Sequence, residues 1–167
     1  MIQKTLVVLK PDTISRGLVG EVMSRFERVG LKICAIKMVK PTKEFYFHHY
    51  ETIGQMISRR GQKAFDMTLD YMNVGPVIAI VLEGIDTVKL MRKMVGATQS
   101  SEAAPGTIRG DYSHMTFGYA DVISQGLPNM IHASGDEAEA ALEIAHRFAP
   151  EELFDYDLCN KPFIYGK

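Results

Sequence analysis

The stretch that most constrains the fold is Val77–Leu82, an unbroken run of β-branched and aliphatic residues. Gly75-Pro76 precedes it and Glu83-Gly84 follows it, and pairs of this kind mark turns. The run is far shorter than the roughly 18 apolar residues of a membrane span, so it predicts a buried strand. Glu83-Gly84 is expected to turn the chain into a helix over residues 86–95.

Strand and helix patterns alternate over the first half of the chain. Thr5–Leu9 and Lys32–Val39 are rich in β-branched or aliphatic residues and predict two further strands. Between them, apolar residues at helical spacing predict a helix from Gly17 to Val29 that ends at Gly30. Residues 44–72 predict two or three short helices, which Thr42 would cap and Gly54 and Gly61 would interrupt.

The second half contains a long stretch without periodicity, followed by a strand and a helix. Residues 96–128 carry five glycines and two prolines, and a loop of this length in a compact domain is usually functional or disordered. Met130-Ile131 predicts a short strand, and Glu137–Phe148 predicts a helix that Asp136 would cap. The side chains expected to face inward from this helix are Ala140, Ala141, Ile144, Ala145 and Phe148.

Length and composition favour one α/β or α+β sandwich domain over residues 1–167. Nineteen basic and twenty acidic residues give a net charge of −1, which argues against general binding to nucleic acid or to a membrane surface. Cys34 and Cys159 form neither a CxxC motif nor a disulfide framework, so a cytoplasmic location is expected. The sequence contains no signal peptide or membrane span.

Several common phosphate and metal motifs are missing from the sequence. There is no GxxxxGK[ST], no GxGxxG, no kinase HRD or DFG, and no HExxH. The remaining candidates are Lys10, Arg92, Arg109 and His132. Taken singly, Lys10 and Arg92 are typical surface charges, and His132 is typical of a structural histidine. Only Arg109 lies between glycines that permit close approach to a ligand. His48 and His49 are expected at the surface and the core edge of a helix.

Seven blocks distributed in order along the chain carry a resemblance to a known family. They are Thr5–Asp12, Arg16-Gly17, Gly75-Pro76-Val77, Leu82-Glu83-Gly84, Pro105–Tyr112, Asn129–Ser134 and Pro150–Leu153. With them the chain resembles nucleoside diphosphate kinases over nearly its whole length. The resemblance implies a ferredoxin-like α+β sandwich, with a four-stranded antiparallel sheet covered by helices, assembled as a homo-oligomer.

The resemblance also implies a reaction. His132 would take the γ-phosphate of a nucleoside triphosphate, typically ATP, as phosphohistidine and pass it to a nucleoside diphosphate in a ping-pong cycle. A neutral imidazole needs no separate base to act as nucleophile, but it must be held in one tautomer. Glu143 matches the family's glutamate that binds the other ring nitrogen, Ser134 would assist near the leaving oxygen, and Tyr50 would pack beside His132.

The remaining matches concern the nucleotide. Lys10, Arg92 and Arg109 match the family's phosphate ligands, Thr98 a hydroxyl donor to the phosphates, and Asn129 a ligand of the ribose hydroxyl. These contacts fit phosphoryl transfer, which depends on positioning and on neutralising charge. Mg²⁺ would bind mainly through the nucleotide phosphates, so no protein metal site is expected.

The chain departs from the family in three places. The family stacks the base on a phenylalanine in a helical hairpin, yet here the segment between Tyr50 and Tyr71 is longer and Ala64 falls at that position, with Phe65 as the alternative. Gly135 replaces a common aspartate, which would loosen the start of the last helix unless Asp136 caps it. The longer segment 113–127, which contains His114, Phe117 and Tyr119, is either a subunit contact or a lid.

Two other classes of function compete with the kinase. A non-catalytic module on the same fold would have lost the nucleophile or a phosphate ligand, whereas His132, Lys10, Arg92 and Arg109 are all present. A nucleic-acid-binding domain would carry an aromatic RNP-like strand or a positive charge, and this chain has neither.

Overall fold

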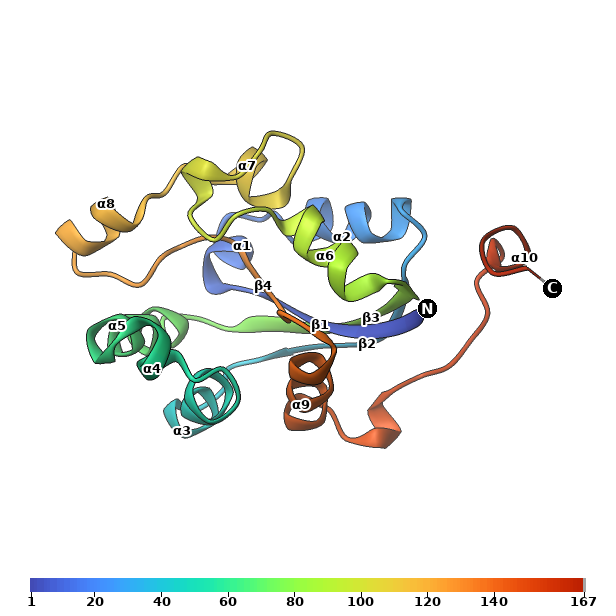
Figure 1. Cartoon of the computed structure of the whole chain (residues 1–167), viewed down its shortest axis with the longest axis horizontal. Helices are drawn as coiled ribbons and strands as arrows, with labels where there is room; N and C mark the ends of the chain where they lie inside the picture. The colour runs from blue at the N-terminus through green and yellow to red at the C-terminus, as the bar shows by residue number, and fades with distance from the viewer. Residues whose placement is uncertain (167) are drawn as a thin grey trace.

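The computed structural model describes residues 1–166, which form one four-stranded antiparallel sheet with helices on both faces (Figure 1). The strand order is β2-β3-β1-β4. The strands are β1 (Ile2–Leu9), β2 (Lys32–Val39), β3 (Val77–Ile85) and β4 (Ile131–Ala133). The predicted fold class is therefore confirmed. Position 167, which the predicted domain includes, lies outside the described residues.

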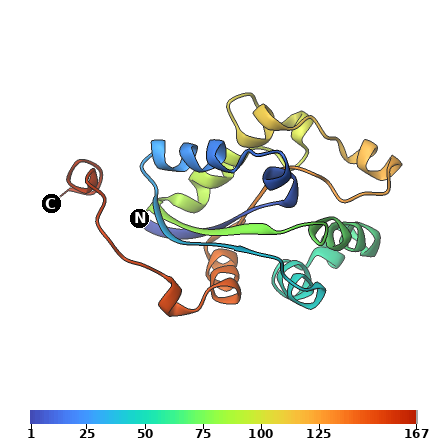
Figure 2. The ribbon, with the colours of Figure 1, turned by 180° about the vertical axis from the view of Figure 1, so that it is seen from behind.

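Two layers of helices enclose this sheet (Figures 1 and 2). One face carries α1 (Pro11–Ser15), α2 (Val19–Arg28), α6 (Thr87–Val95), α7 (Ile108–Tyr112) and α8 (Phe117–Val122). The other carries α3 (Lys43–Phe47), η1 (His48–Ile53), α4 (Met56–Arg60), α5 (Gln62–Met72) and α9 (Glu137–Arg147). The remaining short helices are η2 (Ser100–Glu102), η3 (Pro150–Glu152) and α10 (Lys161–Ile164).

Strand β1 supplies both hydrophobic cores. Its side chains alternate between the faces, so Val7 and Leu9 pack with α2 and α6, while Leu6 and Val8 pack with α3, α5 and α9. Residues 5–9 are accordingly all buried. Burial on both faces explains why this strand and β3 read as continuous apolar runs rather than as alternating ones.

The predicted turn at Glu83-Gly84 is wrong, because β3 continues through both residues to Ile85. Ile2 pairs with Ile85 and Gln3 with Gly84, so pairing with β1 keeps the chain extended. The turn falls at Asp86, which has a left-handed backbone with φ 46°. Helix α1 was not among the predicted helices. It begins with Pro11, at a position where a helix needs no backbone N–H.

The inward face of α9 also differs from the prediction. Ala140 and Phe148 are buried as expected, but Ala141 and Ala145 are exposed. Glu143 and Arg147 are buried in their place, with relative exposures of 1% and 5%. Alanines lie on several faces of this helix, so its hydrophobic pattern does not determine its rotation. The polar contacts of Glu143 determine it instead.

Other predicted helix ends are confirmed. The side chains of Thr42 and Asp136 accept hydrogen bonds from the backbone N–H of Phe45 and Glu139, which caps α3 and α9. Gly54 and Gly61 end η1 and α4 as expected, but residues 43–72 form four helices rather than the two or three predicted, because a separate π-helical segment follows α3. No helix within residues 1–166 is long and apolar enough to cross a membrane.

The close packing at Gly84 generates a prediction. A Cβ built at Gly84 would lie 2.6 Å from Leu31 Cδ2 and 2.9 Å from Thr87 Oγ1. We expect Gly84→Ala to lower the free energy of unfolding by about 1–3 kcal/mol, because overpacking forces neighbours to shift. Urea unfolding followed by circular dichroism measures this. Gly20→Ala in α2, where a Cβ meets nothing within 4 Å, should raise stability by up to ~1 kcal/mol. Equal stability of the Gly84→Ala variant and the wild type would contradict the prediction.

Candidate active site

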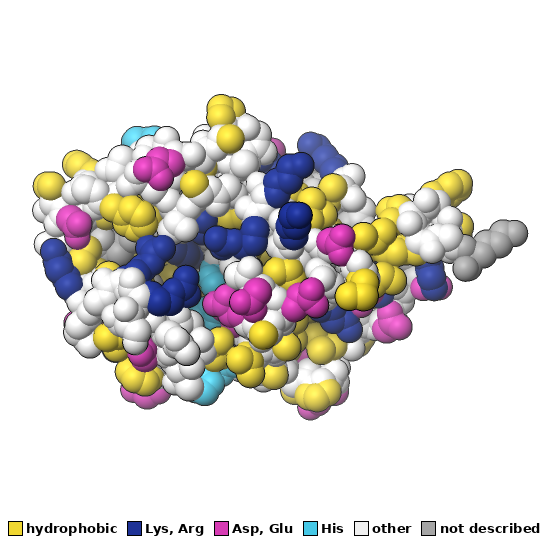
Figure 3. Space-filling view, in the orientation of Figure 1, with side chains coloured by type: hydrophobic (Ala, Val, Ile, Leu, Met, Phe, Trp, Pro, Cys, Tyr) yellow, Lys and Arg dark blue, Asp and Glu magenta, His cyan; other side chains and the backbone are white. Residues whose placement is uncertain are grey.

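A cleft of about 430 Å³ lies between the α4–α5 pair and α8. Positive side chains gather in it (Figure 3). The cationic residues that line it are Lys10, Arg59, Arg60, Lys63, Arg92 and Arg109. The acidic ones are Asp121, Glu139 and Glu143. Of the residues predicted for the site, those that line the cleft are Lys10, Tyr50, Arg92, Thr98, Arg109, Asn129, His132 and Glu143. The fold therefore brings together residues from widely separated segments.

His132 lies in the middle of β4, opposite Val8 of β1. Its neighbours Ile131 and Ala133 point into the core beneath α6, so strand alternation directs His132 to the other face, toward α9. There its Nε2 lies 2.7 Å from Oε1 of Glu143. An ionised carboxylate only accepts hydrogen bonds, so this contact places the ring proton on Nε2 and the lone pair on Nδ1.

The chain enters β4 through a strained residue. Met130 has a positive φ of 72°, which is unusual for a residue other than glycine. Its backbone N–H donates to Asp12 Oδ2 at 3.0 Å, and its carbonyl accepts from the backbone N–H of Lys10 at 2.9 Å and from the Thr13 hydroxyl. These bonds hold the backbone immediately before His132 in one conformation.

Glu143 is a buried carboxylate with both oxygens bonded. While Oε1 contacts His132, Oε2 accepts a hydrogen bond from the Ser134 hydroxyl at 2.6 Å. Burial alone would raise the pKa of Glu143, but the contact with His132, the hydrogen bond from the Ser134 hydroxyl and the charge of Arg147 together lower it. Glu143 is therefore held ionised, and it fixes the orientation of the imidazole.

The structure revises the position of Ser134. The resemblance placed its hydroxyl near the leaving oxygen, but the residue is fully buried, does not line the cleft, and donates to Glu143. It therefore orients Glu143 rather than a phosphate. Tyr50 does line the cleft, and its ring lies edge-to-face against His49 with centroids 4.8 Å apart.

His49 belongs to the site. Its predicted place at the core edge is wrong, whereas His48 is exposed as expected. It is 1% exposed, its Nε2 lies 3.5 Å from Glu143 Oε1, and its ring meets that of His132 edge-to-face at 4.9 Å. Burial, aided by the charge of Arg147, lowers the pKa of His49 well below its ordinary value and keeps it neutral. The available signal was its place directly before Tyr50, which the resemblance put beside the nucleophile.

His49, His132 and Glu143 each bring a potential metal-ligand atom within 4.8 Å of the others. The shortest of these separations is already a hydrogen bond between His132 and Glu143, and two of the three residues are almost fully buried. We therefore interpret the cluster as a hydrogen-bonded support for His132.

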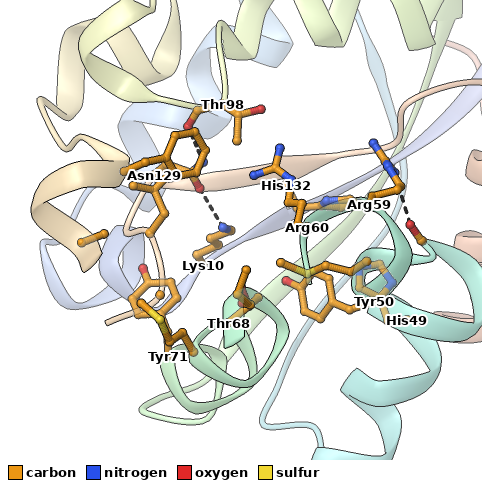
Figure 4. Close-up of a pocket in the computed structure, with 18 of the residues that line it drawn as sticks. Lys10, His49, Tyr50, Arg59, Arg60, Thr68, Tyr71, Thr98, Asn129 and His132 are labelled. Carbon is orange, nitrogen blue, oxygen red and sulfur yellow. Dashed lines mark hydrogen bonds between the residues drawn. The ribbon is translucent and has the colours of Figure 1, made fainter. Parts of the chain in front are cut away.

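Lys10, Asn129 and Thr98 form a chain along one wall of the cleft (Figure 4). Lys10 Nζ donates to Asn129 Oδ1 at 2.7 Å, and Asn129 Nδ2 donates to the carbonyl of Thr98 at 2.8 Å. Burial, and next the charge of Arg109, lower the pKa of Lys10 to about 7, although Asp12 opposes the shift. An anion in the cleft would restore the charge of this lysine.

Arg109 is held by backbone carbonyls rather than by a carboxylate. Its Nε and two terminal nitrogens donate to Asn129, Gly96 and Ile131, at 3.2, 3.1 and 2.6 Å. Burial, and next the charge of Arg92, lower its pKa to about 10. Arg92 in turn donates to the carbonyl of Ala133 at 3.3 Å. Positive groups so close together without a carboxylate partner form a site for a polyanion.

The sequence left open whether Phe65 stacks on the base, and the structure turns Phe65 away from the cleft. Phe65 is 2% exposed and packs edge-to-face on Phe47 at 5.6 Å, while its neighbour Ala64 lines the cleft.

The other two departures from the family are ordered in the structure. Gly135 does not loosen the start of α9, because Glu139 Oε2 accepts a hydrogen bond from the Gly135 N–H at 2.7 Å and Asp136 caps the helix. Segment 113–127 forms α8 and one wall of the cleft.

Comparison with known proteins agrees with this arrangement. The family model for nucleoside diphosphate kinase matches residues 3–153. The chain belongs to the nucleoside diphosphate kinase family. A nucleoside diphosphate kinase from Pyrococcus horikoshii is 45% identical over 92% of this chain and 90% of that protein. One from Borreliella burgdorferi is 39% identical over 93% of each chain.

Solved nucleoside diphosphate kinases have the same fold. The Borrelia burgdorferi enzyme, in a transition-state mimic with bound vanadate and ADP, superposes with a TM-score of 0.96 at 37% identity, covering 99% of this chain and 98% of that one. The Halobacterium salinarum enzyme in complex with CDP gives 0.83 at 35% identity and 99% coverage of both chains. The family match includes every residue of the cleft described above.

The lowered pKa of Lys10 generates a prediction about pH. The free lysine loses its proton above about pH 7, whereas bound diphosphate should raise its pKa, so ADP binding takes up a proton in the alkaline range. The affinity for ADP should therefore fall as pH rises above 7, by up to about tenfold per pH unit. Titration calorimetry at about pH 8.5, in two buffers of different ionisation enthalpy, measures the uptake directly.

The matched control is Lys10→Arg, which keeps a charge at all these pH values. It should bind ADP with little proton uptake and a flatter pH dependence. Equal proton uptake by the wild type and the Lys10→Arg variant would show that another group titrates.

Proposed function

We propose that this chain transfers the γ-phosphate of a nucleoside triphosphate, typically ATP, to a nucleoside diphosphate through phosphohistidine at His132. The observation that carries the proposal is the 2.7 Å contact between Nε2 of His132 and ionised Glu143, on a residue that lines a cationic cleft. It leaves the lone pair on Nδ1 as the nucleophile.

The reaction then needs no separate base. Nδ1 attacks the γ-phosphorus, the bond to the β-phosphate oxygen breaks, and the nucleoside diphosphate leaves. The ring becomes positively charged as the N–P bond forms, and Glu143, with both oxygens bonded, stabilises that charge through Nε2–H. A second diphosphate attacks the phosphohistidine by the reverse route, which returns the ring to its first state.

Lys10, Arg92 and Arg109 bind the phosphates in this proposal, while the Thr98 hydroxyl donates to the phosphates and Asn129 binds a ribose hydroxyl. All five residues line the same cleft as His132. Transfer of a phosphoryl group depends on neutralising charge on its oxygens, which these fixed cations do. A merely structural role for Lys10 and Arg109 is disfavoured, because both are buried and burying cations without carboxylate partners costs stability.

Mg²⁺ fits this cleft as a partner of the nucleotide. Cationic side chains outnumber carboxylates, and Glu143 is already bonded to His132 and Ser134. The ion would be held mainly by the phosphates, with Glu139 beside Gly135 as the available carboxylate for its water shell. Bound there, it would reduce the negative charge of the phosphates.

We further propose one domain over residues 1–167 that assembles as a homo-oligomer in the cytoplasm. Both cysteines are free thiols, which suits a reducing compartment. Strand β2 lies at the edge of the sheet and exposes Ile36 and Met38 by 52% and 56%. An apolar sheet edge of this kind is suited to pairing with another chain.

A labelling experiment tests the proposed reaction. With ATP labelled on the γ-phosphate, the wild type should form an acid-labile, base-stable phosphoprotein that discharges onto GDP. His132→Ala should remain unlabelled. Glu143→Gln keeps the shape but loses the carboxylate, so kcat should fall on the order of 10²–10⁴-fold while the cleft still binds ADP. Labelling of His132→Ala to the wild-type level would overturn the assignment.

A second experiment tests assembly. Light scattering on the purified chain should give a mass that is a multiple of 18.7 kDa. Met38→Lys places a charge on the exposed edge and should lower that mass, whereas Leu142→Lys on the solvent face of α9 should leave it unchanged. A wild-type protein that is monomeric at micromolar concentration would rule out the oligomer.

A further inference from the structure

On α5, the residue at the position where the family carries its stacking phenylalanine offers no ring to a nucleotide base. Ala64 lines the cleft there, and Phe65 packs away against Phe47. Apart from histidines, the aromatic residues that line the cleft within the described chain are Tyr50, Tyr71 and Phe117. The two tyrosines lie at the phosphate end, since Tyr50 contacts His49 and Lys10 Nζ lies 5.8 Å from the ring centroid of Tyr71. Phe117 is the remaining ring.

The N-terminus of α8 fixes the position of Phe117 beside Thr98. The backbone N–H of Phe117 donates to Gln99 Oε1 at 2.8 Å, and the backbone N–H of Ser101 donates to the Met115 carbonyl at 3.3 Å. Thr116 caps the helix by accepting from the Tyr119 N–H at 3.0 Å. The ring is therefore held on the side of the cleft where Thr98 and Asn129 lie.

The far end of the same segment is anchored to α5. Gly126 packs so closely that an added Cβ would lie 2.5 Å from the Met67 carbonyl oxygen and 2.7 Å from Tyr71 Cβ. Lys63 and Asp121 form an ion pair at 3.6 Å. These contacts hold α8 opposite α4 and α5, so the two longer segments of the chain face each other across the cleft (Figure 1).

The face of the Phe117 ring already carries a planar group. The guanidinium carbon of Arg60 lies 5.4 Å from the ring centroid, and both residues line the cleft. Arg60 also lies near the phosphate-binding cations, and in Figure 4 its side chain shares the cleft with Lys10 and His132. Phe117 keeps 40% of its surface exposed, which is ample for a further stacking contact.

We propose that Phe117 stacks on the nucleotide base, so that the aromatic platform of the cleft comes from α8 rather than from α5. The inference rests on the function proposed above. The nucleotide phosphates draw Arg60 off the ring, and the base takes the face that Arg60 covered. Because every base has a π-face, the platform accepts both purines and pyrimidines. The larger purine ring offers more stacking area, so purines should bind more tightly.

Calorimetry with two ligands tests this proposal. The ligands are ADP and ribose 5-diphosphate, which keeps the sugar and both phosphates but lacks the base. Phe117→Ala should weaken ADP binding by about tenfold and leave ribose 5-diphosphate binding unchanged. Phe117→Tyr should restore ADP binding. Tyr119→Ala, on the same helix but outside the cleft, is the matched control and should bind both ligands as the wild type does.

Two outcomes would overturn the inference. Unchanged ADP binding by Phe117→Ala would show that the ring does not touch the base. Equal weakening of ADP and ribose 5-diphosphate would show that Phe117 only supports the cleft wall. The labelling experiment on the wild type separates both results from a failure of the proposed function, because it reads phosphohistidine at His132 without any change at Phe117. Absence of phosphohistidine from the wild type would reject the function itself.

Discussion

The site depends on the hydrogen bond between the part-buried His132 imidazole and the buried Glu143 carboxylate. A carboxylate without partners at that depth would become protonated, since burial favours the neutral form. His132 and Ser134 occupy both of its oxygens, and the charge of Arg147 further favours the ionised state. One contact therefore sets the tautomer of the histidine, the ionisation of the glutamate and the rotation of α9 about its axis.

The cationic wall places a second demand on the fold. Lys10 and Arg109 are 9% and 4% exposed, and neither contacts a carboxylate. Hydrogen bonds to an amide oxygen and to backbone carbonyls partly compensate for the lost hydration without neutralising the charge. The lowered pKa values of both residues reflect the remaining cost. A bound polyphosphate relieves that cost, so stability given up in the free protein becomes affinity for the nucleotide.

Much of the fold followed from local pattern. The apolar runs of β1, β2 and β3, the amphipathic α2 and the caps at Thr42 and Asp136 are short-range signals, and each of these elements formed. Only β2 kept both predicted bounds, while β1 begins at Ile2 and β3 continues to Ile85. Predictions failed where a distant partner decided the outcome. Pairing with β1 extended β3 through Gly84, and α9 turned Glu143 inward instead of Ala141 and Ala145. Phe65 found its place against Phe47 rather than in the cleft.

The sequence by itself determined the chemistry, because the residue types and their order in the blocks around Lys10, Arg109 and His132 are those of a nucleoside diphosphate kinase. Only the tertiary structure decided which atoms meet. It placed His49 behind the nucleophile, turned Ser134 to Glu143, and set α8 with Phe117 across from α5. The physical reason is that side-chain contacts between segments far apart in the chain depend on strand register, helix rotation and close approaches such as that at Gly126, none of which a local pattern encodes.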